Sequence, residues 1–199
     1  MIQSAGIALV VKSLLGTSPI SSLPYVLSLI SPFTFGQTTF AVNMVFVVFE
    51  LLMLRRDFPA VFWLQIPVTI LFGFCIDFFM QLFAIVPEAY ALKLLLCLLG
   101  TALVALGVAG QGIADVLMLA GEGAARKTGI DFGKVKVGND ISLVAIAAIV
   151  SVLTLGTIEG IREGTLISAL LTGIIARFYL RHLSRIDAHG RLYLAPHKS

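Results

Sequence analysis

Charged residues are scarce in this chain of 199 residues. Only 13% of the residues are Asp, Glu, Lys or Arg, whereas 58% are hydrophobic. A soluble domain has about 25% charged and about 45–50% apolar residues, and it needs that charge to keep its surface hydrated. The shortage of charge therefore excludes an ordinary soluble domain. It predicts an all-α, polytopic membrane protein in contact with the lipid bilayer.

Residues that bind metals or attack substrates are also few. The chain has two cysteines and three histidines. Cys75 and Cys97 lie inside apolar stretches and are interpreted as buried thiols. The sequence has no metal-ligand spacing, no GxxxxGK[ST] phosphate loop and no HExxH or GxSxG motif. We therefore expect neither an enzyme nor a bound metal or cofactor.

Long apolar stretches take the place of these motifs. A helix needs about 20 apolar residues to cross the hydrocarbon core of a bilayer. Residues 13–36 have no charge but contain three prolines and six serines, which predicts a short or re-entrant helix buried in protein. The apolar N-terminus is too short to cross alone, so it predicts a short first span. Five further spans are expected at 37–54, 60–86, 91–110, 139–158 and 164–182.

Two motifs occur twice. The pattern Phe-Gly-(six residues)-Asn begins at Phe35 and recurs, with Asp in the last place, at Phe132. The pattern Gly-(three residues)-Asp-Phe begins at Gly73 and recurs, with Arg for Asp, at Gly173. Such internal similarity is typical of membrane proteins made of two related repeats.

The repeats divide the chain into two membrane units and a tail. We expect a first repeat at 1–86, a second at 87–183 and a cytoplasmic basic tail at 184–199. Three spans in each repeat make the second repeat inverted relative to the first. Aligning Gly6 with Gly107 indicates a first helix shortened by one to two turns, through natural truncation or a misassigned start codon.

Positive charges indicate the orientation. Only three basic residues fall on one side of a six-span layout, and ten fall on the other. Basic loops stay in the cytoplasm, so both termini are expected there, in the cytoplasmic membrane of a bacterium. Topology explains the basic excess better than nucleic acid binding does. The three basic residues expected outside the cytoplasm are Lys12, Lys93 and Arg162. The ten expected on the cytoplasmic side are Arg55, Arg56, Arg126, Lys127, Lys134, Lys136, Arg181, Arg185, Arg191 and Lys198.

Polar residues within the apolar stretches are the candidates for a solute pathway, because such groups are costly in a membrane. Asp77 and Arg177 occupy matching places, and they form a structural ion pair, extend separately to the membrane surface, or form a gating or substrate-linked pair. Asn43 and Asp140 also match, and either cap helices or line a cavity. The broken segments around Ser21, Ser22 and Glu122 are either polar connectors or a solute site. The candidates are Ser21, Ser22, Asn43, Asp77, Glu122, Asp140 and Arg177.

Three segments resemble the YczE/YyaS/YitT family of bacterial integral membrane proteins. They are LGTSPISSLPYVLS (15–28), TGIDFGKVKVGND (128–140) and GIREGTLISALLTG (160–173). The resemblance implies a multi-pass protein of the cytoplasmic membrane. It supplies no site residues, because the family lacks an agreed biochemical activity. The chain departs from the family at its shortened first span.

The repeats and the paired broken segments favour a carrier for a small solute or ion that works by rocking of two inverted halves. The alternative is a membrane scaffold or regulator that acts through a partner protein and transports nothing. An enzyme acting on lipids is the weakest alternative, because no cluster of His, Asp or Glu gathers at one interface. A homodimer is compatible with the sequence, and nothing in it requires one.

Overall fold

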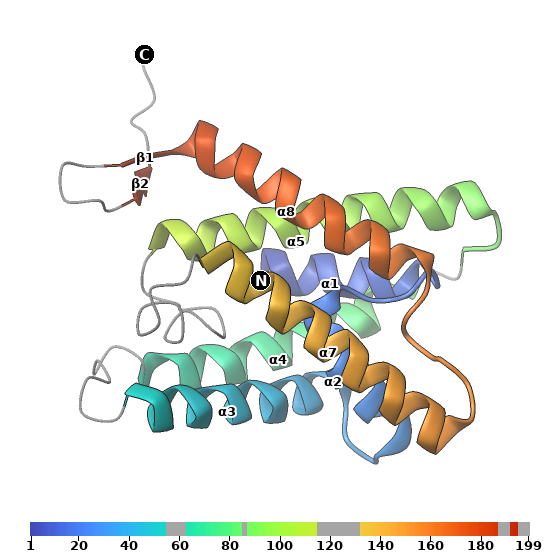
Figure 1. The fold of residues 1–199 in the computed structure, drawn as a ribbon. Coiled ribbons are helices and arrows are strands. Elements are labelled where there is room, and N and C mark those ends of the chain that lie inside the picture. The colour runs from blue at the N-terminus through green and yellow to red at the C-terminus, as the bar shows by residue number, and fades with distance from the viewer. Residues whose placement is uncertain (55–62, 85–86, 115–131, 187–191, 195–199) are drawn as a thin grey trace.

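Seven helices and a short two-stranded ribbon form the described part of the chain (Figure 1). The computed structural model describes residues 1–54, 63–84, 87–114, 132–186 and 192–194. The helices are α1 (Ile2–Lys12), α2 (Pro19–Ile30), α3 (Phe35–Leu54), α4 (Gln65–Leu82), α5 (Tyr90–Ala114), α7 (Phe132–Leu155) and α8 (Glu163–Leu183); the strands are β1 (Ser184–Ile186) and β2 (Leu192–Leu194).

The helices occur where the apolar stretches predict them. The five long helices α3, α4, α5, α7 and α8 overlap the five expected spans. Among the described residues, two segments are long and apolar enough to cross a membrane, Gln65–Leu82 and Tyr90–Gly110. Helix α1 has 11 residues, which is roughly 16 Å at 1.5 Å per residue and about half of a bilayer core. Apart from the short antiparallel pairing of β1 with β2 in the tail, the described part of the chain is helical, as the all-α prediction expects.

Backbone geometry explains why α2 is separate from α1. Leu14 has φ 60° and Gly16 has φ 120°, values that end a right-handed helix. Ser18 is extended, and Pro19 then begins α2 at a position where a proline costs no hydrogen bond. Helix α2 ends after 12 residues at an extended Ser31. The segment is therefore a short helix inside the protein, as its prolines predict.

Helices α1 and α5 cross closely and run antiparallel. A β-carbon on Gly6 would lie 2.7 Å from the Gly100 carbonyl oxygen, and one on Gly100 would lie 2.7 Å from that of Gly6. Gln3, near the start of α1, meets Gly107 in the later part of α5, whereas Val10 meets Gly100. Small residues let the two backbones approach in this way.

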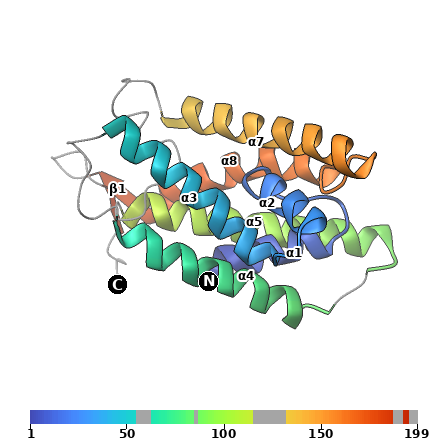
Figure 2. The same ribbon diagram turned by 90° about the horizontal axis from the view of Figure 1, so that it is seen from below.

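The other contacts place α1 and α2 in the middle of the molecule. Helix α1 packs on α4 as well as α5, and α2 packs on α3 and α7 (Figures 1 and 2). Ser4 Oγ donates to the Phe72 carbonyl of α4 at 3.4 Å. One buried apolar cluster joins α1, α3, α4 and α5 through Ile7, Val11, Phe35, Ile76 and Val104.

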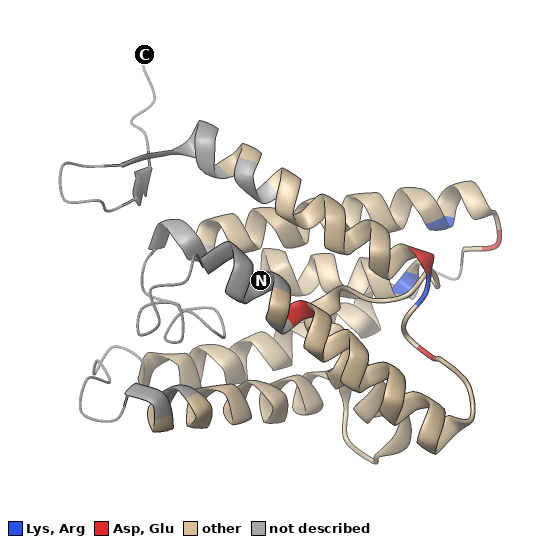
Figure 3. Ribbon diagram, in the orientation of Figure 1, with Lys and Arg blue, Asp and Glu red and all other residues tan. Residues whose placement is uncertain are grey.

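The outer faces of the long helices are apolar. Large side chains such as Leu153, Leu170 and Phe74 are 80%, 71% and 69% exposed. Charged residues are sparse along the described helices (Figure 3). A soluble protein rarely leaves so much contiguous apolar surface uncovered.

The described helix ends lie at two opposite ends of the molecule. Helix α5 runs antiparallel to α1, so Lys93 near its start lies at the same end as Lys12. Arg162 joins them, since its Nη1 lies 3.4 Å from the Leu14 carbonyl oxygen. The last turns of α3, α5 and α8 and the first turns of α4 and α7 lie at the other end (Figure 1).

Candidate functional site

A small cavity of about 80 Å³ lies between α1, the start of α2, α5, α7 and α8. Its polar lining consists of Gln3, Ser18, Asp140 and Thr172. Thr172 lies near the middle of α8, and Asp140 lies in the first half of α7. Residues from both predicted repeats therefore meet around one space.

The hydroxyl of Thr172 is unusual among the lining groups. The residue is only 9% exposed, and its Oγ1 has no hydrogen-bond partner in the described part of the chain. A threonine in a helix commonly donates to its own backbone, and a buried polar atom without a partner costs about 1–3 kcal/mol. Thr172 therefore brings an unused donor and acceptor to the wall of the cavity.

The start of α2 supplies a second polar element. Ser18, Pro19 and Ile20 line the cavity and are the cap and first two residues of this helix. The first N–H groups of a helix lack helical partners and together form its positive end. At the same place, Pro24 has no N–H to donate to the carbonyl of Ile20. Pro19 has no N–H, and Ser21 N donates to the Ser18 carbonyl at 2.9 Å, so the N–H of Ile20 is the donor that the first turn leaves for a ligand.

A network of buried hydroxyls fixes the start of α2. Thr17 N and Thr17 Oγ1 both donate to the Gly160 carbonyl, at 3.0 and 3.1 Å. Thr17 N also lies 3.2 Å from Thr165 Oγ1. In addition, Gly164 N donates to the Leu15 carbonyl at 2.8 Å. This network, which we name the hydroxyl joint, ties the segment before α2 to the start of α8.

Ser21 and Ser22 lie behind the cavity, within the hydroxyl joint. Ser22 Oγ is 3.1 Å from Thr17 Oγ1 and donates to the Ser18 carbonyl at 3.2 Å. Ser18 Oγ donates to Ser21 Oγ at 3.0 Å. Of the three serines, Ser18 alone lines the cavity, so the two predicted residues support its wall.

Asp77 lies away from the cavity and caps another helix. Its carboxylate accepts a hydrogen bond from Gly36 N at 2.7 Å and one from Thr34 Oγ1 at 2.6 Å, both at the start of α3. Asn43 is half-buried in α3 and does not line the small cavity, nor the larger one between α1, α4 and α5. Glu122 and the side chain of Arg177 lie outside the described residues, so the pairing of Asp77 with Arg177 stays a prediction.

Sequence reasoning missed Thr172, although a signal for it exists. Thr165, Ser168 and Thr172 follow one another at spacings of three and four in α8, which places them on one face of that helix. All three are buried. A stripe of hydroxyls inside an apolar helix indicates a face turned toward protein rather than lipid.

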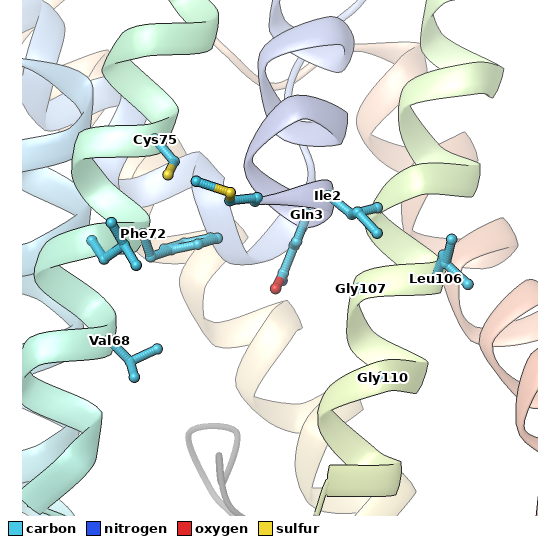
Figure 4. Close-up of a pocket in the computed structure, with 10 residues that line it drawn as sticks. Ile2, Gln3, Val68, Phe72, Cys75, Leu106, Gly107 and Gly110 are labelled. Carbon is cyan, nitrogen blue, oxygen red and sulfur yellow. The ribbon is translucent and has the colours of Figure 1, made fainter. Parts of the chain in front are cut away.

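A second, larger cavity lies beside the first. It has a volume of about 390 Å³ and lies between α1, α4 and α5 (Figure 4). Its walls are mainly apolar and include Val68, Phe72 and Leu106. Gln3 lines both cavities, and in Figure 4 its side chain projects into the space between α4 and α5. Gln3 therefore lies at the boundary between the larger apolar space and the smaller polar one.

The described part of the chain has no set of side chains suited to binding a metal ion. No group of three or more His, Cys, Asp or Glu residues gathers there. The side chains around the small cavity are suited to hydrogen bonding and to one ionic contact through Asp140.

Comparison with known proteins places the chain in a family without assigning it an activity. No curated protein matches the chain, and no solved structure does. A family model matches residues 1–181, and its description is a family of unknown function, DUF6198. Because the match covers nearly all of the sequence, the chain belongs to the family of unknown function DUF6198.

Proposed function

We propose that this protein is a carrier for a small solute in the bacterial cytoplasmic membrane, built from six spans in two inverted halves. The observation on which the proposal depends is the small cavity around Asp140 and Thr172. Carriers with inverted repeats bind solutes near the membrane midplane, where broken helices of the two halves meet. This cavity lies near the middle of α8 and has the start of the short helix α2 in its wall.

The packing of α1 against α5 supports the inverted arrangement. These are the first helices of the two proposed halves, and they cross antiparallel around Gly6 and Gly100. Two equivalent helices related by an axis in the membrane plane must run in opposite directions. Close backbone contact between glycines also leaves few interlocking side chains to resist a change of crossing angle.

We include in the proposal a relationship to the YczE/YyaS/YitT family, which rests on the three resembling segments of the sequence. Two of the three resembling segments, 15–28 and 160–173, contact each other through Thr17, Gly160 and Thr165. The apolar outer faces of the helices support a membrane location.

Transport by purified full-length protein in proteoliposomes tests the proposal. The panel consists of radiolabelled amino acids, amines, organic acids, sugars and inorganic phosphate, with protein-free liposomes as the blank. We expect the wild-type protein to accumulate one class of solute. Asp140→Asn should slow its initial uptake by about tenfold or more, because a charge-assisted contact is lost. Glu88→Gln removes an exposed carboxylate outside the cavity and is the matched control.

Absence of uptake for every solute in the panel would overturn the carrier proposal. Cross-linking in native membranes would then decide whether the scaffold alternative holds. A scaffold would be captured with one constant partner protein in both wild-type and Asp140→Asn membranes.

A further inference from the structure

The small cavity combines two polar elements of opposite character. Asp140 contributes the only carboxylate among its described lining residues. The start of α2 contributes the positive end of a helix dipole, which favours negative groups. A ligand with a single charge satisfies one of these elements and opposes the other.

We propose that the cavity binds a small zwitterion, an amino acid with a hydrogen atom or a methyl group as its side chain. The ammonium group contacts the Asp140 carboxylate, and the carboxylate lies at the start of α2. The inference rests on the proposed carrier function for its physiological meaning, and the binding itself is measurable without transport.

Thr172 is the independent observation that points to a ligand here. Its Oγ1 is buried and has no hydrogen-bond partner in the described part of the chain, although the residue lines the cavity. A hydroxyl beside the first turn of α2 is placed to donate to a ligand carboxylate together with the N–H of Ile20, because Pro19 has no N–H and Ser21 N donates to the Ser18 carbonyl. The carbonyl of Ile20, which receives no hydrogen bond from Pro24, is an acceptor suited to the ammonium group.

Size and wall chemistry restrict the zwitterion. A water molecule requires at least about 10–15 Å³ of such space, so a cavity of about 80 Å³ has room for a few non-hydrogen atoms. The other walls are formed by Val104, Val108 and Ala169, which offer aliphatic contact and no side-chain hydrogen bonds. Glycine and alanine meet both limits, whereas larger or polar side chains do not.

Equilibrium binding to full-length protein in lipid nanodiscs tests the proposal. The probes are radiolabelled glycine and alanine, with methylammonium and acetate as competitors that each carry one of the two charges. We expect both amino acids to bind and each single-charge competitor to be weaker by about tenfold or more, since it makes one charge-assisted contact instead of two. Equal binding of methylammonium, equal binding of acetate, or no binding of any probe would overturn the proposal.

Two variants locate the binding. Asp140→Asn removes the carboxylate and should weaken glycine binding by about tenfold or more. Thr172→Val removes the hydroxyl and should weaken it by about threefold or more. The matched controls are Glu88→Gln and Thr154→Val; Thr154 is an exposed residue of α7 that donates to its own helix at Val150. If a variant does not fold, competition of methylammonium and acetate with glycine on the wild-type protein still tests whether the ligand is a zwitterion. Unchanged binding in both folded cavity variants would overturn the location.

Measuring glycine binding and solute uptake separately distinguishes the zwitterion site from the carrier proposal. Glycine binding without uptake into proteoliposomes would support the zwitterion site and contradict the carrier. Uptake of a different solute class without glycine binding would support the carrier and contradict the zwitterion site.

Discussion

At the scale of single residues, small and hydroxyl-bearing side chains determine how closely the helices of this protein pack. Gly6 and Gly100 bring two backbones into contact, and Gly164 does the same for the first turn of α8 and the Leu15 carbonyl. In a membrane, such contacts contribute where apolar side chains gain little, since lipid tails are as apolar as leucine. A single methyl group at these positions therefore has a large effect.

Gly6→Ala should destabilise the protein. The new β-carbon would lie 2.7 Å from the Gly100 carbonyl oxygen and 2.7 Å from Val104 N, both backbone atoms that cannot move alone. Overpacking of this kind costs about 1–3 kcal/mol, more than the helix propensity that alanine gains. The measurement is thermal unfolding of detergent-solubilised protein. Gly138→Ala is the control, because nothing lies within 4 Å of its added β-carbon. Equal unfolding temperatures would contradict the close crossing.

The candidate site shows how far residue patterns alone can predict a position. The repeated motif made Asn43 and Asp140 equal candidates for a solute pathway, yet Asp140 lines the small cavity and Asn43 does not. The difference arises from packing partners, since α7 lies against α2 whereas α3 lies against both α2 and α4. A sequence match between two helices does not specify which third helix each one meets.

At the scale of secondary structure elements, composition predicted the helices well because each break has a local cause. Positive φ angles at Leu14 and Gly16 separate α1 from α2, and Gly156 and Gly160, with φ 70° and 74°, lie in the turn between α7 and α8. The β1–β2 ribbon was not predicted, because three-residue strands leave no periodic pattern. The capping of α3 by Asp77 was also missed, since its partners lie 41 and 43 residues away in the sequence.

The cap at the start of α3 should contribute measurable stability. Asp77→Asn weakens the hydrogen bonds to Gly36 N and Thr34 Oγ1 and removes negative charge from a helix start. Loss of a cap costs about 0.5–2 kcal/mol. Thr34→Val should have a similar effect, and the double variant should lose less than the sum of the two, because both remove the same hydrogen bond.

Thermal unfolding of the three variants and the wild type completes this double-mutant cycle. Thr154→Val serves as the control for removal of an exposed hydroxyl. Strict additivity of the Asp77 and Thr34 effects would show that the two side chains do not act together. A stability of Asp77→Asn equal to that of the wild type would contradict the capping role.

At the scale of the whole molecule, two independent features agree on one arrangement. The sequence assigns Lys12, Lys93 and Arg162 to one side of a six-span layout, and the structure brings the three together at one end. The helix ends that flank the more basic loops lie at the other end (Figure 1).

Cysteine labelling tests the arrangement in the membrane. In a background without Cys75 and Cys97, Lys93→Cys and Leu64→Cys each place one thiol at an opposite end, since residue 93 lies near the start of α5 and residue 64 precedes α4. Both native thiols are buried, so their replacement leaves the exposed ends unchanged. We expect the basic loops to be cytoplasmic, so an impermeant maleimide should label residue 93 in intact spheroplasts and residue 64 only in inverted vesicles. Labelling of both residues from one side would contradict the transmembrane arrangement, and the reverse pattern would contradict the expected orientation without contradicting the proposed inverted halves.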